Sequence, residues 1–224
     1  AEHVWDARKE FLGDYPEAEA AVAQAADLAA DLTVDDDPVV LADVGDNPGG
    51  GGTADETTLL RELLNQGVTN AGFAILRDPG AVTACIDAGV DERITLDLGA
   101  ASPGSITEPI EDVDGYVKAV TDGRFRNYGP KATGTRNDLG RAVRLQCGRN
   151  DGIEVLLTEN RLQPADTEIW RHLGIQPERL NVLVVKSTNH YRADYEPCAS
   201  HVLPVNTPGL AAMDQRRFEH QNLT

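Results

Sequence analysis

The chain has 224 residues and a formal net charge of -17 at pH 7, with 37 acidic and 20 basic side chains. This length allows one large domain with a substantial hydrophobic core. A strongly negative surface repels the phosphates of nucleic acids and of anionic membranes, so we expect neither as a partner.

Residues 1–37 are predicted to form a helical lead-in, or a linker from an absent N-terminal domain. An alanine-rich helix is expected over residues 17–32, because Pro16 suits the first turn of a helix. A run of three aspartates follows it. Residues 38–224 are predicted to form a single α/β domain.

An apolar run over residues 39–44, preceded by Pro38, predicts a buried strand. The loop that follows carries carboxylates, an amide and a run of glycines: Asp43, Asp46, Asn47, Gly49, Gly50, Gly51 and Gly52. Glycine lets the main chain approach a ligand closely, and open α/β sheets bind ligands at the carboxyl ends of their strands. The sequence therefore predicts a ligand site at this loop.

Four other interpretations of the loop are weighed against a catalytic one. A nucleotide P-loop is disfavoured, because Gly52 stands where a lysine would precede Thr53. A dinucleotide fingerprint fits residues 49–54 with Asp78 further on, but Pro48 occupies the place of the tight strand-to-helix turn. The loop could also be a plain glycine turn, or part of a non-catalytic module that captures an anionic small molecule through backbone N–H groups.

Helices and strands alternate after the glycines. We expect a helix through residues 59–64 capped by Asp55 or Thr53, a strand over 68–76, a helix over 81–88 and a strand over 93–98. Right-handed crossovers between such strands predict a parallel sheet.

The middle of the chain changes character. Two strand-like runs are predicted within residues 106–125, around positions 114–115, and a hairpin joins 141–147 to 153–157. Residues 128–137 are interpreted as a solvent-exposed connection rather than a lid. The predicted fold class is thus α/β, with a mixed, largely parallel sheet flanked by helices and an antiparallel hairpin inserted in the middle.

Alternation resumes towards the C-terminus. The pattern predicts a helix from residue 164 to 173, a strand over 182–185, a short helix over 191–199 and a strand over 201–205.

Polar side chains also follow the predicted strand at residues 182–185. Lys186 offers a compact positive charge, His190 can act as a general acid or base, and Arg192 can hold a carboxylate with two hydrogen bonds. Because parallel strands end at one edge of a sheet, we expect this segment beside the glycines. The structural alternative is that Asn189 caps a helix, His190 satisfies a buried carbonyl and Arg192 pairs with an acidic neighbour.

Several segments together carry a resemblance: residues 41–51 followed by Asp55 and residues 57–61, then residues 159–166, 173–175, 184–193 and 206–210. In order and spacing they resemble the later motifs of the microcystinase C (MlrC-type) metallopeptidase family. The resemblance implies that the chain is the C-terminal half of a zinc-dependent peptidase or amidohydrolase.

In the resembled family the principal zinc ligands lie in an N-terminal domain, which would be the partner of this chain, and the metal activates water and polarises the scissile carbonyl. The resemblance implies a peptide or amide substrate and catalytic roles for Asp46 and Asn47, which would orient or hold the substrate or the metal-bound water. His190 is the third predicted catalytic residue, because an imidazole can act as a general acid or base. Substrate binding is assigned to a second set: Lys186, Asn189, Arg192, Gly49, Gly50 and Gly51. Asp46 is a possible metal ligand, but we expect no tight zinc binding by this chain alone, since it has no HExxH motif.

Composition predicts the setting of the protein. An acid-rich chain with only four lysines suggests a halophilic source, in which high salt screens the self-repulsion of the acidic surface. No apolar run approaches about 18 residues, which favours a cytoplasmic location. The three cysteines are far apart and are expected to be reduced. An oligomer remains compatible with the sequence.

Overall fold

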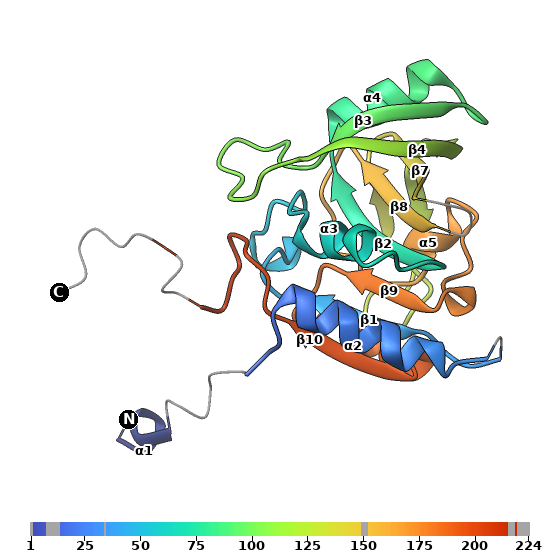
Figure 1. The fold of residues 1–224 in the computed structure, drawn as a ribbon. Coiled ribbons are helices and arrows are strands. Elements are labelled where there is room, and N and C mark those ends of the chain that lie inside the picture. Colours follow the sequence, from blue (N-terminus) through green and yellow to red (C-terminus); the bar gives the residue numbers. More distant parts are fainter. Residues whose placement is uncertain (1, 8–13, 34, 149–151, 215–217, 219–224) are drawn as a thin grey trace.

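The computed structural model describes residues 2–7, 14–33, 35–148, 152–214 and 218. Within them, eight strands form one mixed sheet in the order β10-β1-β9-β2-β8-β7-β4-β3, with helices packed against it (Figure 1). The strands are β1 (Val39–Asp43), β2 (Ala71–Arg77), β3 (Arg93–Leu98), β4 (Ile110–Thr121), β7 (Ala142–Cys147), β8 (Ile153–Thr158), β9 (Val182–Val185) and β10 (His201–Val205). The predicted α/β class with a mixed, largely parallel sheet is confirmed.

The parallel part of the sheet brings five carboxyl ends to one edge. Strands β10, β1, β9, β2 and β8 run parallel to their neighbours in this order. Strand β9 comes late in the sequence and inserts between β1 and β2. Every residue of β1 and β9 is buried, as central strands covered on both faces require.

The antiparallel part confirms one prediction and corrects two. Strands β7 and β8 form the predicted hairpin, whose turn at residues 149–151 lies outside the described residues. Strand β4 is one continuous strand rather than two runs. A Cβ at Gly115 would lie 2.7 Å from Leu145 Cδ1 on the neighbouring strand β7. That glycine therefore permits close packing within the strand instead of making a turn.

The prediction that the strand at residues 93–98 is parallel is wrong. Strand β3 lies at the sheet edge and pairs antiparallel with β4, with Arg93 opposite Tyr116. The right-handed crossover rule applies only to strands that are parallel within one sheet. Here α4 leads to the edge of the sheet, where β3 runs antiparallel to its neighbour β4.

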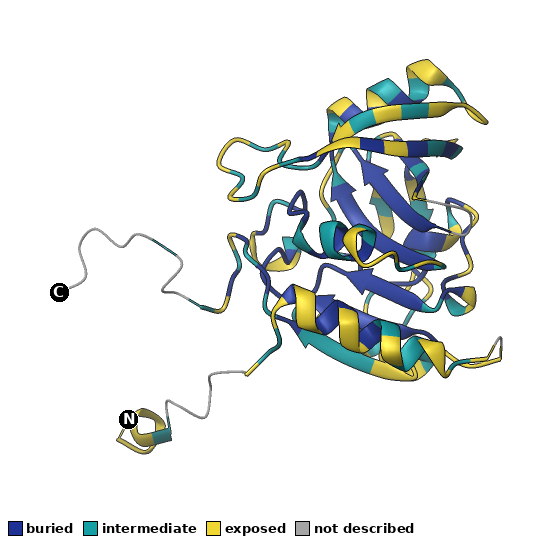
Figure 2. Ribbon diagram, viewed as in Figure 1, coloured by how far each residue is buried: buried dark blue, intermediate teal, exposed yellow. Residues whose placement is uncertain are grey.

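Two helical layers cover the sheet. Helices α2 (Ala18–Ala30), α3 (Thr58–Asn65) and α4 (Pro79–Ala88) pack on one face, and α5 (Glu168–Arg171) lies on the other. Alternate residues of β1 belong to two hydrophobic cores, one on each face of the sheet. Val39 and Leu41 lie in the core under α2, α3 and α4, and Val40 and Ala42 lie in the core on the side of α5. Figure 2 shows the buried strands and the exposed outer side of α2.

Helix α2 falls inside the predicted lead-in. Its residues Ala18, Ala21, Val22 and Ala25 are buried in the first core. Small side chains on this side let the helix lie close to β1 and β10. Residues 18–30 thus contribute to the core of the α/β domain.

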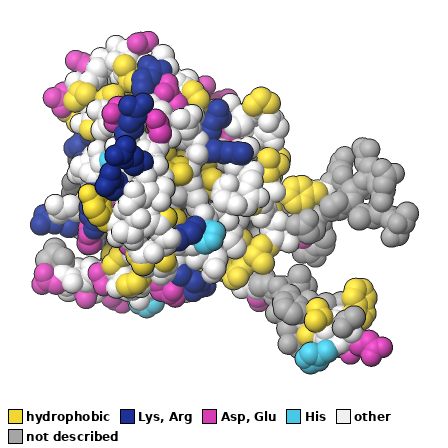
Figure 3. Space-filling view, turned by 180° about the vertical axis from the view of Figure 1, so that it is seen from behind, with side chains coloured by type: hydrophobic (Ala, Val, Ile, Leu, Met, Phe, Trp, Pro, Cys, Tyr) yellow, Lys and Arg dark blue, Asp and Glu magenta, His cyan; other side chains and the backbone are white. Residues whose placement is uncertain are grey.

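A small hairpin, β5 (Arg124–Arg126) with β6 (Arg136–Asp138), extends from the end of β4. Phe125 stacks on His172 with ring centroids 4.9 Å apart, which attaches the hairpin to the second layer. On the face seen in Figure 3, Lys and Arg side chains gather beside Asp and Glu. Exposed ion pairs, such as that of Arg124 with Asp138 in the small hairpin, contribute little stability each.

Two predicted boundaries also change. Helix α3 begins at Thr58, and Thr53 and Asp55 do not cap it, because they bond to Asp46 and to Ser105 respectively. The helix predicted at residues 191–199 is two 3-10 turns, η4 (His190–Ala193) and η5 (Glu196–Cys198). None of the described helices has the length and apolar composition needed to cross a bilayer.

Candidate functional site

Two loops meet at the carboxyl edge of the parallel strands. The glycine loop (residues 44–57) follows β1, and the His190 loop (residues 186–194) follows β9, the neighbour of β1 in the sheet. Asn47 Nδ2 donates to Thr188 Oγ1 at 3.1 Å and joins the two loops directly. The predicted proximity of the two segments is therefore present.

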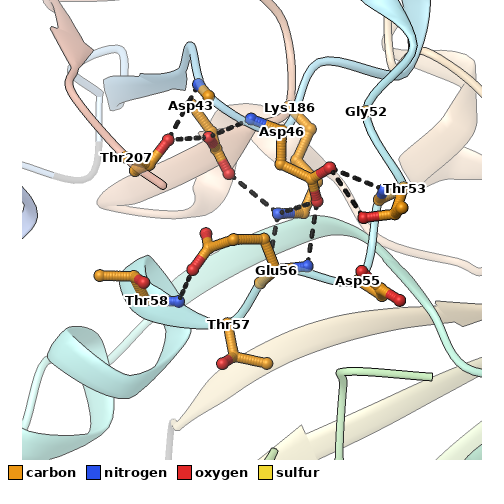
Figure 4. A network of polar contacts seen from close by, with 12 residues as sticks. Asp43, Asp46, Gly52, Thr53, Asp55, Glu56, Thr57, Thr58, Lys186 and Thr207 are labelled. Carbon is orange, nitrogen blue, oxygen red and sulfur yellow. Dashed lines mark hydrogen bonds and ion pairs between the residues drawn. The ribbon is translucent and has the colours of Figure 1, made fainter. Parts of the chain in front are cut away.

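Beneath the loops lies a buried charge cluster of Asp43, Asp46, Glu56 and Lys186 (Figure 4). The Lys186 ammonium is 2.9 Å from Asp43 Oδ2 and 3.1 Å from Asp46 Oδ2. It also donates to the carbonyl oxygen of Glu56 at 2.9 Å. The side chains of Lys186, Asp43 and Asp46 are 0% exposed, so these contacts are shielded from solvent.

The Asp46 carboxylate organises the glycine loop. Its Oδ1 accepts the Ala54 N–H at 2.9 Å and the Thr53 hydroxyl, and its Oδ2 accepts the Glu56 N–H at 3.0 Å. A Cβ at Gly52 would lie 2.6 Å from the Asp46 carbonyl carbon. The loop consequently wraps tightly around one buried carboxylate, and this position requires glycine.

Asp43 connects the cluster to the segment after β10. It accepts hydrogen bonds from the Thr207 hydroxyl and from the Asp46 N–H. A Cβ at Gly45 would lie 2.1 Å from the Thr207 carbonyl oxygen, so the backbones touch there as well. Three separate parts of the chain are therefore held together at this edge.

The charges in the cluster shift one another's protonation. Burial alone would lower the pKa of Lys186, but the charges of Asp43, Asp46 and Glu56 outweigh it and raise the pKa. Burial raises the pKa of Glu56 to about 7, against the opposing effect of the Lys186 ammonium. Among the described atoms, Glu56 Oε2 is buried without a hydrogen-bond partner, which fits a carboxyl group that holds a proton near neutral pH.

Above the cluster is a more exposed rim formed by Asn47, Gln163, Thr188 and His190. Asn47 is 8% exposed, and its Oδ1 accepts the Gly49 N–H at 3.0 Å. Gln163 Nε2 donates to Asn47 Oδ1 at 2.8 Å, and Gln163 Oε1 lies 2.7 Å from His190 Nδ1. His190 itself is exposed. The rim thus presents an imidazole and an amide to solvent at the junction of three loops.

The predicted site residues divide between these two layers. Asn47 and His190 are on the rim, whereas Asp46 and Lys186 belong to the charge cluster. The expectation that Lys186 touches substrate does not fit a side chain with 0% exposure and two carboxylate partners. Asp46 is equally buried, and its carboxylate bonds to Lys186 and to the backbone of the glycine loop.

Arg192 matches the structural alternative, because it pairs with an acidic neighbour, whereas Asn189 does not. Both are exposed, and Arg192 Nε donates to Asn189 Oδ1 at 3.2 Å. The Arg192 guanidinium also pairs with Glu196 at 3.0 Å. Asn189 makes no side-chain cap bond to η4.

The glycine N–H groups are already used inside the loop. Gly49 N–H bonds to Asn47 Oδ1, Gly50 and Gly52 N–H to the Asn47 carbonyl, and Gly51 N–H to the Pro48 carbonyl. Anion capture by these four donors is therefore contradicted. The dinucleotide interpretation is also wrong in its geometry, since the glycines form a 3-10 turn, η2 (Pro48–Gly50), well before α3 starts.

The buried carboxylates Asp43 and Asp46 do not form a metal site. Within the described residues no group of three or more His, Cys, Asp or Glu side chains could hold a metal ion. Asp43 and Asp46 do converge, but the Lys186 ammonium occupies the position between them. Asp46 is consequently not a metal ligand in this arrangement.

Sequence reasoning missed Gln163 and Glu56. Gln163 lies in the loop after β8. The local sequence pattern there does not predict that its side chain contacts both the glycine loop and the His190 loop. Its membership of the motif at residues 159–166 was the only available indication. Glu56 is not recognisable from the sequence, because it meets Lys186, which follows β9 and lies 130 residues further along the chain.

Comparisons with known proteins agree with this architecture. The family model described as MlrC C-terminus matches residues 41–222. Microcystinase C from Sphingomonas sp is 29% identical over 168 residues, which is 75% of this chain and 32% of the relative. The chain therefore spans about a third of the curated relative that it matches.

A crystal structure with a similar fold is named "Putative metallopeptidase from Mesorhizobium sp. BNC1". It is 26% identical to this chain and superposes with a TM-score of 0.82. The match covers 97% of this chain and 41% of that chain. Both similar proteins thus extend well beyond the part that this chain resembles.

Proposed function

This chain belongs to the MlrC C-terminal family, and on that premise we propose that it forms the C-terminal part of a metal-dependent hydrolase of peptide or amide bonds. The greater length of its relatives supports an arrangement in which an N-terminal portion completes the active site. The metal ligands, with zinc as the expected metal, are assigned to that portion because the described residues here offer no such group.

The convergence of the glycine loop and the His190 loop carries the proposal. Ligands of α/β sheets bind outside the carboxyl ends of parallel strands, and the rim lies at that place. Its polar groups come from loops after β1, β8 and β9 and are connected by hydrogen bonds. A merely structural edge would not need an exposed imidazole held by an amide.

Each layer has its own role in this proposal. The exposed His190 imidazole accepts or donates a proton during hydrolysis, which is its usual work near neutral pH. The Asn47 amide orients the substrate or the attacking water beside it. Asp46 and Lys186 hold the glycine loop in shape from below. The exposed surface of Gly49, Gly50 and Gly51 lets a substrate backbone approach the loop closely.

The genomic reading frame upstream of this sequence provides the first test. We expect coding sequence for carboxylate and histidine ligands there or in an adjacent gene. The protein that includes this portion should contain stoichiometric metal and hydrolyse members of a fluorogenic peptide panel, whereas the 224-residue chain alone should not.

Asn47→Ala in that longer protein should reduce kcat/KM by 10-fold or more, corresponding to about 1.4 kcal/mol of lost transition-state stabilisation. Asn189→Ala serves as the matched control, because that exposed amide bonds only to Arg192 among the described contacts. Efficient hydrolysis by the 224-residue chain alone, or a metal-loaded longer protein that cleaves no peptide, would contradict the proposal.

A further inference from the structure

The hydrogen bonds of the rim fix the orientation of the Gln163 side-chain amide. The backbone N–H of Gly49 can only donate, so the Asn47 atom that it reaches at 3.0 Å is the oxygen. Gln163 approaches the same oxygen at 2.8 Å and must therefore present its NH₂ group. Gln163 Nε2 also lies 3.3 Å from Ser187 Oγ, a second acceptor.

With its NH₂ group directed at Asn47, Gln163 turns its carbonyl oxygen towards His190. Lys131 supports this orientation independently, because its ammonium can only donate and lies 3.4 Å from Gln163 Oε1. A Cβ at Gly49 would lie 2.6 Å from Gln163 Oε1, so the amide is also closely packed against the glycine loop. Rotation of the amide would disrupt these contacts.

The orientation of Gln163 determines which nitrogen of His190 carries hydrogen. Gln163 Oε1 is an acceptor 2.7 Å from His190 Nδ1, and two acceptors cannot form a hydrogen bond with each other. Nδ1 must therefore hold a proton. In the neutral imidazole the lone pair is then on Nε2, the nitrogen on the opposite side of the ring from Gln163.

We propose that Gln163 is a positioning residue that holds His190 as the Nδ1–H tautomer and leaves the Nε2 lone pair available at the rim. Gln163 acts through His190 and does not need to touch the substrate. The use of that lone pair as a proton acceptor rests on the proposed function, but the tautomer itself does not. Gln163 thereby links the conformation of the glycine loop, through Asn47, to the protonation site of His190.

Nitrogen-15 NMR of the histidine side chains in the 224-residue protein tests the proposal, because long-range proton–nitrogen correlations distinguish the two neutral tautomers. The chain has five histidines, and His190→Gln identifies the signals of His190. In the wild-type protein at a pH where His190 is neutral, Nδ1 should carry the proton. The Nε2–H tautomer there would overturn the proposal.

Two substitutions separate positioning from general stability. Gln163→Leu removes the acceptor and should shift His190 towards a mixture of tautomers, whereas Gln163→Glu keeps an acceptor oxygen and should preserve Nδ1–H. Gln176→Leu, at an exposed position before η3 (Pro177–Arg179), is the matched control and should change nothing at His190. Unchanged signals of the exposed His201 report that the fold is intact.

An unaltered Nδ1–H tautomer in a folded Gln163→Leu protein would also overturn the proposal. If that variant does not fold, loss of Nδ1–H in a folded Gln163→Glu protein has the same meaning. The tautomer and the hydrolase activity are measured separately. A confirmed tautomer in an inactive longer protein would therefore reject the proposed function alone, and active protein with the wrong tautomer would reject this inference alone.

Discussion

The charge cluster and the rim lie one above the other at the same edge of the sheet, yet they differ in almost every physical property. The Lys186, Asp43 and Asp46 side chains of the cluster have no solvent contact, and Lys186 satisfies two carboxylates and a carbonyl at once. The rim uses neutral amides, a hydroxyl and an exposed imidazole. The difference indicates that buried charges fix the loop conformations, while the His190 imidazole is exposed to solvent.

The strongest way to break this division is to remove the cation of the cluster. Lys186→Met leaves Asp43 and Asp46 buried together without a counter-charge. We expect a loss of about 3–5 kcal/mol in the free energy of unfolding, the usual cost of breaking a buried ion pair. Urea denaturation measures it, with the exposed Lys131→Met as the control, expected to change stability by about 0.5 kcal/mol or less. A loss below about 1 kcal/mol in Lys186→Met would show that the cluster does not support the fold.

Glycine-to-alanine substitutions, which add one methyl group, test how tightly the glycine loop packs around Asp46. Gly52→Ala would place Cβ within 2.8 Å of Asp46 and Asn47 backbone atoms, so we expect a loss of about 1–3 kcal/mol from overpacking. At Gly50 the nearest atom is Ala211 Cβ at 3.4 Å, and Gly50→Ala should be close to neutral. Equal thermal stability of the two variants would contradict the described loop geometry.

The pH dependence of stability tests the protonated state of Glu56. Its pKa is raised to about 7 in the folded protein, so the folded state binds the proton more tightly than the unfolded chain. This contribution is complete below the ordinary pKa of 4.5 and is lost as the pH rises through about 7. Each pKa unit corresponds to roughly 1.4 kcal/mol.

Glu56→Gln cannot ionise, and its stability relative to the wild type should therefore increase between pH 5 and pH 8. Denaturation curves at both pH values measure the difference. Glu62→Gln, on the partly exposed surface of α3, controls for a general loss of negative charge. A relative stability of Glu56→Gln that stays constant with pH would mean that Glu56 is ionised throughout this range.

Changes on the rim should have the smallest effect on the fold. His190 is exposed and uses one ring nitrogen in a single described hydrogen bond, so His190→Ala should cost about 1 kcal/mol or less. Chemical denaturation of the 224-residue protein provides the measurement. A loss as large as that of Lys186→Met would remove the distinction between the two layers.

The same division explains what the sequence could predict. Strands β1 and β9 are recognisable because apolar runs buried on both faces have a local signature, and the polar residues that follow them mark the site. The pairing of Lys186 with Asp43 was not recognisable, since it depends on β9 inserting beside a strand 143 residues earlier. No local pattern encodes that order of strands.

The rim was only partly predictable for a related reason. Asn47 and His190 follow buried strands, and the rule on carboxyl ends placed them correctly at one edge. Gln163, which connects them, comes from the loop after β8 and became recognisable only through the distances to both partners. For β3 the local pattern gives the wrong result. A helix between two strands favours a parallel pair, whereas β3 pairs antiparallel with β4.

Peptide hydrolysis by the longer protein carrying His190→Ala tests the central claim most directly, with His201→Ala as the control on an exposed histidine of β10. The account predicts that kcat/KM falls by about 10²-fold or more, the usual contribution of a general acid or base, while the free energy of unfolding changes by about 1 kcal/mol or less. A His190→Ala enzyme that folds and retains wild-type kcat/KM would contradict it.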